Sequence, residues 1–373
     1  MRTLLLPFAL STLLSHALAQ QPQNPRRLEQ LQQQFSAQLQ QLAATSPTRE
    51  QRNELLAKHS AELEQFLTSE AKDTDLWNGR LMAADLQLAR GDRAAAATAL
   101  RRIDAKAAPA LLLITAAAMA QHLNLRDLRN EWIEAGTAKE CALPDRLAMA
   151  RLLMTVLREV DRGEGVFTAA LAAAKDDEER ALIRWHRADG LRDREDLGDN
   201  DGFEALEKIA TELPNTYWGS VAKDRLRATR LQPGDPAIAF QAKTRQGDTV
   251  SLASLRGKTV ALVFWSAGDR DMPALLTLLK EQQQRRDENL AVLGVCIDRD
   301  ERSIAAAVQA LGITFPVVGD GKGIETDVAL RWFVEGPVVH VIDGEGKVVA
   351  LGQHAGTADG RSSLLEALNR ARK

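Results

Sequence analysis

The chain has 373 residues, of which 45% are apolar and 27% charged, and its formal net charge is −3. This length is enough for two or three domains with sizeable cores. The small net charge excludes a general electrostatic attraction to nucleic acid or to anionic membrane surfaces. We therefore expect a multidomain globular protein that does not bind nucleic acid.

Residues 1–19 have the pattern of a secretory signal peptide. Arg2 supplies a positive charge, an apolar run extends from Leu4 to Leu14, and Ala17-Leu18-Ala19 provides small residues for cleavage. An uncleaved anchor is the alternative, but the run is short for a bilayer span. We predict cleavage, export to the periplasm or the cell exterior, and no membrane span after cleavage.

Residues 20–70 are predicted to form a helical hairpin. Leucine or phenylalanine recurs every three or four residues from 28 to 42 and again from 55 to 67, a pattern typical of amphipathic helices. The segment 43–47, which ends in Ser-Pro, separates the two helices.

Residues 71–230 continue as alanine-rich helices with short turns. The stretch from Leu81 to Pro109 has small residues, a Gly91-Asp92 turn and a closing proline, and resembles a tetratricopeptide repeat. Gly163 follows Gly91 by about two repeat lengths and is interpreted as a weaker echo of the same pattern. A plain helical bundle is the open alternative, and both interpretations are all-α.

After a linker at residues 231–236, which is rich in Pro and Gly, residues 237–373 alternate between strand and helix patterns. Strands are predicted at 259–265, 290–297, 313–318, 338–342 and 348–351, and helices at 271–286, 301–311, 325–333 and 360–372. The Asp343-Gly344-Glu345-Gly346 sequence indicates a hairpin turn. We predict an α/β domain with a mixed sheet that is covered on both faces.

An ordered set of segments in this domain resembles the AhpC/TSA–TlpA class of exported thioredoxin-like proteins. The segments are Gly234-Asp235-Pro236-Ala237, Gly247 to Leu252, Leu255 to Lys258, Val263 to Ser266, Gly294 to Asp298, Gly312 to Val317, and Gly336-Pro337 before Val341-Ile342-Asp343. The resemblance implies a thioredoxin-like fold in which Pro337 takes the position of a cis proline. For an intact member it also implies thiol–disulfide exchange or peroxidase activity.

The redox cysteines of that class are absent from this chain. In their place stand Ser266, Ala267, Gly268, Asp269, Arg270 and Asp271. Thiol–disulfide chemistry requires a thiolate, so we predict no catalytic residue in this degenerate loop and interpret its aspartates as helix caps. The sequence contains no phosphate loop, dinucleotide fingerprint or metal-ligand cluster, and we predict neither a cofactor nor a metal.

Cys141 and Cys296 are the only cysteines, and they fall in different predicted domains. We interpret them as two separate buried thiols, since free cysteine often behaves as a small core residue. A reactive Cys296 would have to emerge at a strand end near Pro337. The isolated His340 and His354 are interpreted as core or surface residues.

These observations favour an exported protein-binding or scaffold protein with a redox-inactive thioredoxin-like domain and a protein or peptide partner. Thioredoxin folds bind extended peptides beside the cis proline, so the resemblance implies Trp265, Gly336 and Pro337 as candidate binding residues, with Trp332 and Phe333 nearby. The alternative is a TlpA-like thiol–disulfide oxidoreductase, or a peroxiredoxin-type antioxidant enzyme, that uses a non-standard cysteine. A third hypothesis is a structural envelope protein.

Overall fold

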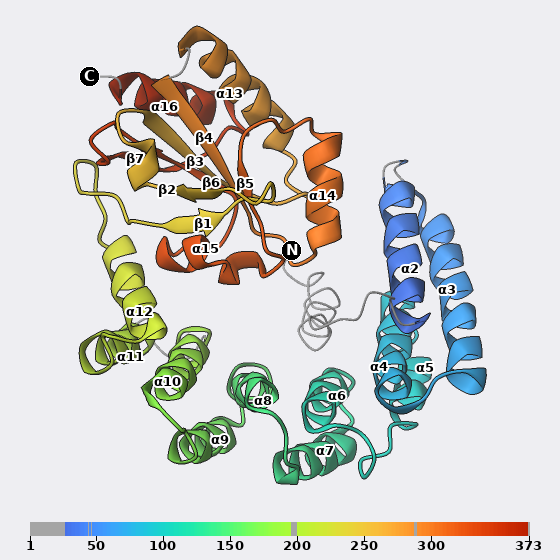
Figure 1. Cartoon of the computed structure of the whole chain (residues 1–373). Helices are drawn as coiled ribbons and strands as arrows, with labels where there is room; N and C mark the ends of the chain where they lie inside the picture. The colour runs from blue at the N-terminus through green and yellow to red at the C-terminus, as the bar shows by residue number, and fades with distance from the viewer. Residues whose placement is uncertain (1–26, 44, 46, 195–199, 287–288, 372–373) are drawn as a thin grey trace. The chain divides into compact units, whose positions relative to one another are not determined.

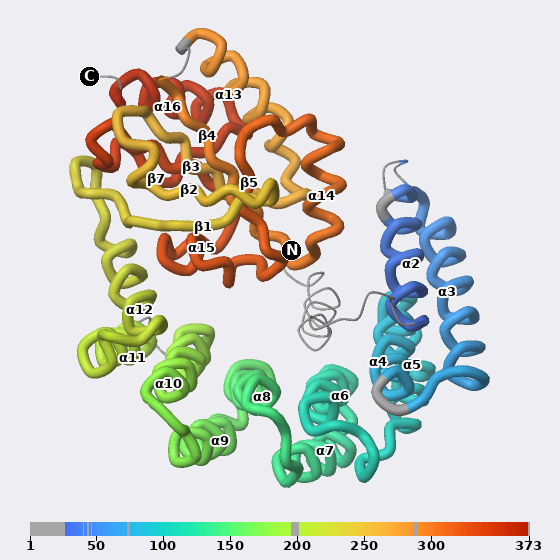
Figure 2. The backbone as a smooth tube through the Cα atoms, viewed as in Figure 1, coloured from blue at the N-terminus to red at the C-terminus, as the bar shows by residue number. Residues whose placement is uncertain are grey.

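A computed structural model describes residues 27–43, 45, 47–194, 200–286 and 289–371 (Figure 1 and Figure 2). The chain divides into two compact units, residues 1–205 and 206–373. The predicted signal peptide at residues 1–19 lies outside the described residues. A helical N-terminal part followed by an α/β domain confirms the predicted fold class.

The first unit consists of helices among its described residues. They are α2 (Arg27–Ala43), α3 (Arg49–Ser69), α4 (Asp73–Arg90), α5 (Arg93–Leu100), α6 (Ala110–His122), α7 (Arg126–Ala138), α8 (Leu143–Thr155), α9 (Val160–Ala172) and α10 (Asp177–Arg192). Helices α4 and α5, α6 and α7, and α8 and α9 pack as pairs, and α6, α8 and α10 contact one another in succession. None of the described helices is long and apolar enough to cross a bilayer.

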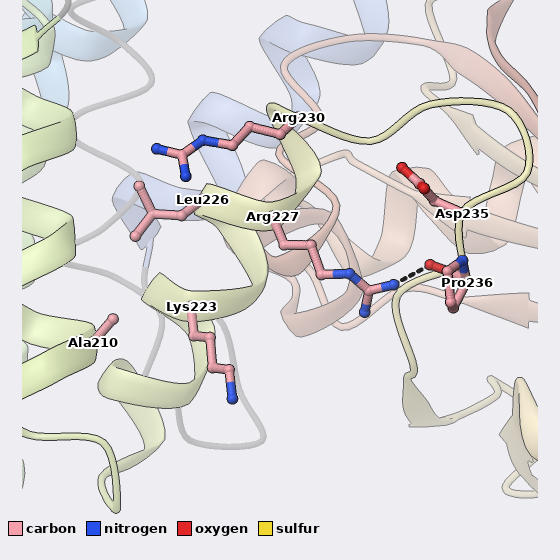
Figure 3. A pocket seen from close by; sticks show the side chains of 7 residues that line it. All are labelled: Ala210, Lys223, Leu226, Arg227, Arg230, Asp235 and Pro236. Carbon is pink, nitrogen blue, oxygen red and sulfur yellow. Dashed lines mark hydrogen bonds between the residues drawn. The ribbon is translucent and has the colours of Figure 1, made fainter.

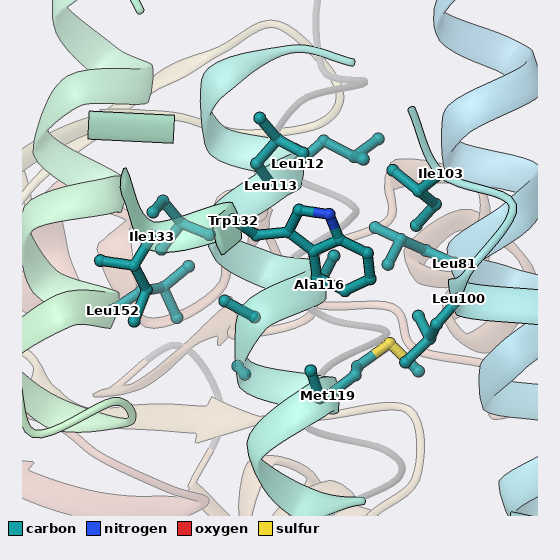
Figure 4. Close-up of a cluster of buried hydrophobic side chains, with 14 of the residues drawn as sticks. Leu81, Leu100, Ile103, Leu112, Leu113, Ala116, Met119, Trp132, Ile133 and Leu152 are labelled. Carbon is teal, nitrogen blue, oxygen red and sulfur yellow. The ribbon is translucent and has the colours of Figure 1, made fainter. Parts of the chain in front are cut away.

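Trp132 of α7 lies in a large buried cluster that joins α4, α5, α6, α7 and α8. Figure 4 shows its indole beside Ala116 and Met119 of α6, with Leu81 of α4 on the far side. Trp132 is 1% exposed, and Ala116 is fully buried. The short alanine side chains of α6 let its neighbours approach closely, which explains why an alanine-rich sequence forms a packed helical array here.

The predicted repeat echo at Gly163 is wrong, because Gly91 and Gly163 have different structural roles. Gly91 ends α4 in the left-handed conformation, with φ of 83°, and Asp92 then caps α5 through the Ala95 amide. Gly163 instead lies inside α9, where it allows close packing on α8. A Cβ at this position would lie 2.4 Å from Cγ of Met154.

The second unit contains a five-stranded sheet in the order β5-β4-β3-β6-β7. The strands are β3 (Thr259–Trp265), β4 (Leu290–Cys296), β5 (Val317–Val318), β6 (Val338–Ile342) and β7 (Val348–Gln353). Strand β4 is parallel to β3 and β5, whereas β6 is antiparallel to β3 and β7. A separate hairpin of β1 (Gln241–Lys243) and β2 (Thr249–Ser251) was not predicted.

Helices cover both faces of the sheet, as predicted. One core contains side chains of α13 (Met272–Arg286), α14 (Glu301–Ala310) and α16 (Ala358–Arg370), together with Trp265 and Cys296. The other contains side chains of α15 (Asp327–Arg331), together with Phe264 and Leu262. Strand β3 contributes alternate residues to each core, which explains its continuous apolar sequence.

The segment 231–236, predicted to link two domains, lies within the second unit. This unit includes α12 (Tyr217–Ala228), which contacts α15, and part of α11 (Asn200–Glu212). Leu231 is buried in the α15-side core. The Gly234 amide donates to the Val348 carbonyl over 2.7 Å. The last helix of the chain's helical part is therefore attached to the α/β domain.

Candidate functional site

The sheet register places the candidate residues at one edge of the sheet, where β3 and β4 end and β6 begins. Trp265 lies opposite Cys296 in the β3–β4 pair, and Phe264 lies opposite Val338 in the β3–β6 pair. The loop after β3, the segment after β4 and Pro337 before β6 consequently share this edge. Cys296 is the last residue of its strand.

The loop 266–271 is held by its own backbone and aspartates. The Asp271 amide donates to Oδ1 of Asp269 over 2.9 Å, and the Leu275 amide donates to the Asp271 carbonyl over 3.0 Å. The Asp271 carboxylate packs against Gly356, where an added Cβ would lie 1.9 Å from Oδ2. Ala267, Gly268, Arg270 and Asp271 are exposed. The loop thus presents small and charged groups, and no thiol.

Cys296 lies just beneath this loop but is shielded from solvent. Its exposed fraction is 0%, and burial raises the pKa of its thiol to about 12. Such a thiol is protonated at neutral pH, and the thiolate is the nucleophilic form. Cys296 therefore lacks the electrostatic environment of a reactive cysteine.

Asp298 connects Cys296 to the loop. Its Oδ2 accepts hydrogen bonds from the Cys296 thiol over 3.3 Å and from the Ala267 amide over 2.6 Å. One carboxylate oxygen therefore ties the buried thiol and the degenerate loop together. This role of Asp298 was not predicted from the sequence, although a carboxylate just past a buried strand is a signal for a residue at the strand end.

Cys141 lies in the first unit, between α7 and α8, and is partly exposed. Both cysteines are free thiols. Burial raises the pKa of the Cys141 thiol, with Arg146 acting in the opposite direction. In the part of the chain that the structure describes, no group of three His, Cys, Asp or Glu residues could hold a metal ion.

The structure separates the three candidate peptide-binding residues. Trp265 is fully buried, so its prediction as a surface contact is wrong: its side chain points into the core beneath α13. The described residues contain no cis peptide bond, so Pro337 also departs from the expected cis geometry. Gly336 and Pro337 line one cavity together with Trp332 and Phe333.

This cavity has a volume of about 430 Å³ and opens beside Pro337. It is lined by residues 332–338, by Ala228 and Leu231 at the end of α12, by His340 of β6, and by β7 and the residues after it. His340 is 7% exposed, and burial lowers the pKa of its imidazole to about 4. The cavity therefore combines a neutral imidazole with mostly apolar residues and the carboxylate of the exposed Glu335.

A second pocket, of about 440 Å³, lies along α12 and is shown in Figure 3. Lys223, Arg227 and Arg230 line it, but two of these cations have partners. Arg227 donates to the Pro236 carbonyl, and Arg230 forms an ion pair with Glu207 over 3.0 Å. These contacts give the pocket a structural role in attaching α12 to the segment that follows it.

Comparison with known proteins agrees with this fold. Residues 233–351 match the AhpC/TSA family. The chain is 29% identical over 149 residues to the thioredoxin-like protein YneN of Bacillus subtilis. That alignment covers 38% of this chain and 82% of YneN. It is 30% identical over 143 residues to a protein of Mycobacterium tuberculosis named as a peroxiredoxin. That alignment covers 33% of this chain and 85% of the other protein.

Two further relatives carry names that refer to thiol–disulfide chemistry. The chain is 28% identical over 123 residues to the thiol-disulfide oxidoreductase ResA of Halalkalibacterium halodurans, covering 32% of this chain and 66% of that protein. A solved structure of the thiol:disulfide interchange protein DsbE from Chlorobium tepidum aligns with a TM-score of 0.34 and 23% identity. That alignment covers 38% of this chain and 98% of the other.

The fold and these matches define the C-terminal part of the chain as a thioredoxin-like redoxin domain, with thiol–disulfide oxidoreductases among its relatives. Through residues 233–351 the chain belongs to the AhpC/TSA family.

Proposed function

We propose that this chain is an exported binding protein whose thioredoxin-like domain does not carry out thiol–disulfide exchange. The state of Cys296 carries the proposal. It is the only cysteine in residues 206–373, it is fully buried, and burial raises the pKa of its thiol to about 12. Exchange begins with attack by a thiolate, and this domain offers none at its surface. The signal-like pattern of residues 1–19 supports export.

The proposed partner is a protein or an extended peptide that contacts the sheet edge. Ala267, Gly268 and Pro337 are exposed there, and their small or rigid side chains leave the backbone accessible to a partner. The stacked helical pairs of the first unit supply further surface, as in other helical arrays that bind proteins. This assignment rests on the retained fold and the lost thiols.

The alternative is a thiol–disulfide oxidoreductase or peroxiredoxin-type enzyme that uses Cys296. The names of ResA and of the M. tuberculosis relative favour this alternative. The position of Cys296 at the end of β4, linked through Asp298 to the loop, also favours it. The alternative requires the loop to open and the thiol pKa to fall before Cys296 can react.

Turnover assays on the purified full chain separate the two functions. We expect no insulin-disulfide reduction and no peroxide consumption above the protein-free rate, for the wild type and for both Cys296→Ser and Cys141→Ser. Activity that disappears only in Cys296→Ser would establish the enzyme and overturn the binding proposal. Thiol titration provides a second readout, and we expect Cys296 to react only after unfolding.

The binding surface is tested with a photoreactive amino acid placed at Ala267. The matched control is the same group at Glu345, which is exposed in the β6–β7 turn. We expect cross-linking to a partner in the exported protein fraction from position 267 and none from position 345. Equal labelling from both positions, or none from either, would contradict the proposed partner surface at the loop after β3.

A further inference from the structure

His340 is the most unusual group in the cavity beside Pro337. It pairs with Leu262 in the sheet, and its imidazole stacks on the Trp332 indole with ring centroids 5.1 Å apart and an interplanar angle of 17°. Its ring also meets the edge of Phe264 at 5.6 Å. The imidazole is therefore held rigidly between two aromatic rings while it lines the cavity.

The hydrogen bonding of His340 defines which ring nitrogen carries the proton. The Gly352 amide donates to Nδ1 over 3.1 Å, so Nδ1 is an acceptor and the neutral ring is protonated on Nε2. Nε2 is not one of the fully buried, unpartnered polar atoms of the described residues, and His340 lines the cavity. Its N–H group is therefore a donor that an acceptor in the cavity can use.

Trp332 provides a second donor to the cavity, and this donor has no acceptor. It is 4% exposed and lines the same cavity, and its Nε1 has no partner among the described residues. The two stacked aromatic side chains thus each supply an N–H donor, and that of Trp332 is buried without a partner. A buried donor of this kind is uncommon in folded proteins and calls for an explanation such as a bound molecule.

The remaining walls favour an apolar molecule without a negative charge. Ala228, Leu231, Val338 and Leu351 contribute apolar surface, and the ionisable side chains besides His340 are those of Glu335 and His354. No lysine or arginine among the described residues lines the cavity, so nothing there would neutralise an anionic group. The volume of about 430 Å³ falls within the range of small-molecule sites.

The wall formed by Phe333 is held in place before any molecule binds. Phe333 has φ of 52°, in the left-handed region that bulky residues avoid. The guanidinium of Arg225 lies 4.7 Å from its ring centroid, and Arg225 is itself buried. A strained residue fixed by its neighbours is typical of binding sites.

We propose that this cavity binds a small, neutral molecule with an apolar, ring-containing body and a carbonyl oxygen that accepts from Nε2 of His340. The cavity shares Pro337 with the proposed partner surface, but Trp332 belongs to the core on the α15 side of the sheet. Small-molecule binding is measured on the purified chain without a partner, so failure of partner binding would leave this test unaffected.

Benzophenone is a suitable probe, because it is neutral, has two rings and one carbonyl, and forms covalent adducts under near-ultraviolet light. Diphenylmethane is its matched control, since a methylene group replaces the carbonyl. We expect the full chain to bind benzophenone roughly five- to tenfold more tightly than diphenylmethane, as one additional hydrogen bond predicts. We expect the photoadducts to map to residues 332–338 and 351–354.

Two variants test the named contacts. His340→Phe keeps an aromatic ring but removes the donor, and it should abolish the preference for benzophenone over diphenylmethane. Ala228→Trp should fill the cavity and block both compounds. His59→Phe is the control, because His59 is also buried and stacks on Phe35 with centroids 4.0 Å apart, but it lies in the first unit. Thermal unfolding of each variant verifies that it folds.

Equal affinity for the two compounds would overturn the proposal, as would a benzophenone preference that survives in folded His340→Phe. Photoadducts spread over the whole chain, or unaltered binding by folded Ala228→Trp, would also overturn it.

Discussion

Arg331 of α15 donates from its guanidinium to Oδ2 of Asp224 on α12 across 2.6 Å. The same side chain contacts Asp327 at 3.0 Å and the Ser220 hydroxyl at 3.0 Å. It is only 15% exposed, so these contacts are protected from the screening that weakens surface ion pairs. The network joins the last helix of the helical part to the redoxin domain.

We therefore predict that Arg331→Met lowers the free energy of unfolding by about 2 kcal/mol, because it leaves a partly buried carboxylate without its partner. A double-mutant cycle with Asp224→Ala, followed by urea denaturation, should give a coupling energy of about 1 kcal/mol or more. The exposed pair of Arg230 and Glu207 is the control, and Arg230→Met should change stability by less than about 0.5 kcal/mol. Zero coupling would show that α12 is held by packing alone.

We expect Asp298 to contribute more to folding stability than to the reactivity of the Cys296 thiol. Asp298→Ala removes the acceptor of the Ala267 amide and of the Cys296 thiol, and we expect a loss of about 1–3 kcal/mol in urea denaturation. The backbone of Asp298 lowers the pKa of the Cys296 thiol, whereas its carboxylate raises it, so removal of the carboxylate alone should lower that pKa.

Burial is the largest cause of the raised thiol pKa, and it remains in Asp298→Ala. We therefore expect Cys296 to stay unreactive in this variant while it is folded, as measured by thiol titration in a Cys141→Ser background. Fast labelling of folded Asp298→Ala would contradict this account and support the enzymatic alternative. Asp248→Ala, at an exposed position, is the control and should leave both stability and labelling unchanged.

Helix α9 contains two glycines with opposite expected behaviour. A Cβ at Gly163 would lie 2.4 Å from Cγ of Met154 and 2.9 Å from the Ala150 carbonyl oxygen, whereas a Cβ at Gly165 would meet nothing within 4 Å. Gly163→Ala should cost about 1–3 kcal/mol through overpacking. Gly165→Ala should raise stability by up to about 1 kcal/mol, since alanine favours a helix interior. Thermal unfolding of the two variants checks the contrast, and a stable Gly163→Ala would contradict the α8–α9 packing.

Asp85 of α4 carries a measurable pH dependence. Burial raises the pKa of its carboxyl from 3.8 to about 6, and Oδ1 has no partner among the described residues. The folded state thus binds the proton more tightly than the unfolded state does. The stability that Asp85 contributes is present at low pH and is lost as pH rises from 3.8 to about 6.

Replacing Asp85 by Asn removes this loss. Relative to wild type, Asp85→Asn should be more stable by about 1–2 kcal/mol at pH 7. This difference in stability should shrink toward zero below pH 3.8, the ordinary pKa of the carboxyl. Urea denaturation across this pH range measures the difference. Glu54→Gln, at an exposed position of α3, should show no such trend, and a pH-independent Asp85→Asn effect would contradict the assignment.

Much of the fold was predictable from local sequence patterns. The helical hairpin before residue 70 and the buried strand at Thr259–Trp265 follow from apolar periodicity, and both occur in the structure. Hydrophobic patterning identifies such elements because burial on a face, or on two faces, imposes a period on the sequence. The short β1–β2 hairpin escaped prediction because three-residue strands leave too few positions to reveal a period.

The site depended more on tertiary structure. The sequence by itself determined that loop 266–271 contains no thiol, and no packing arrangement can restore one. Only the tertiary structure decided that Trp265 points into the core, that Asp298 bridges Cys296 and the loop, and that His340 lines a cavity. These outcomes arise from strand register and burial, which bring together residues far apart in the chain. Local periodicity contains no information about which distant side chains meet, or about the dielectric environment that shifts their pKa values.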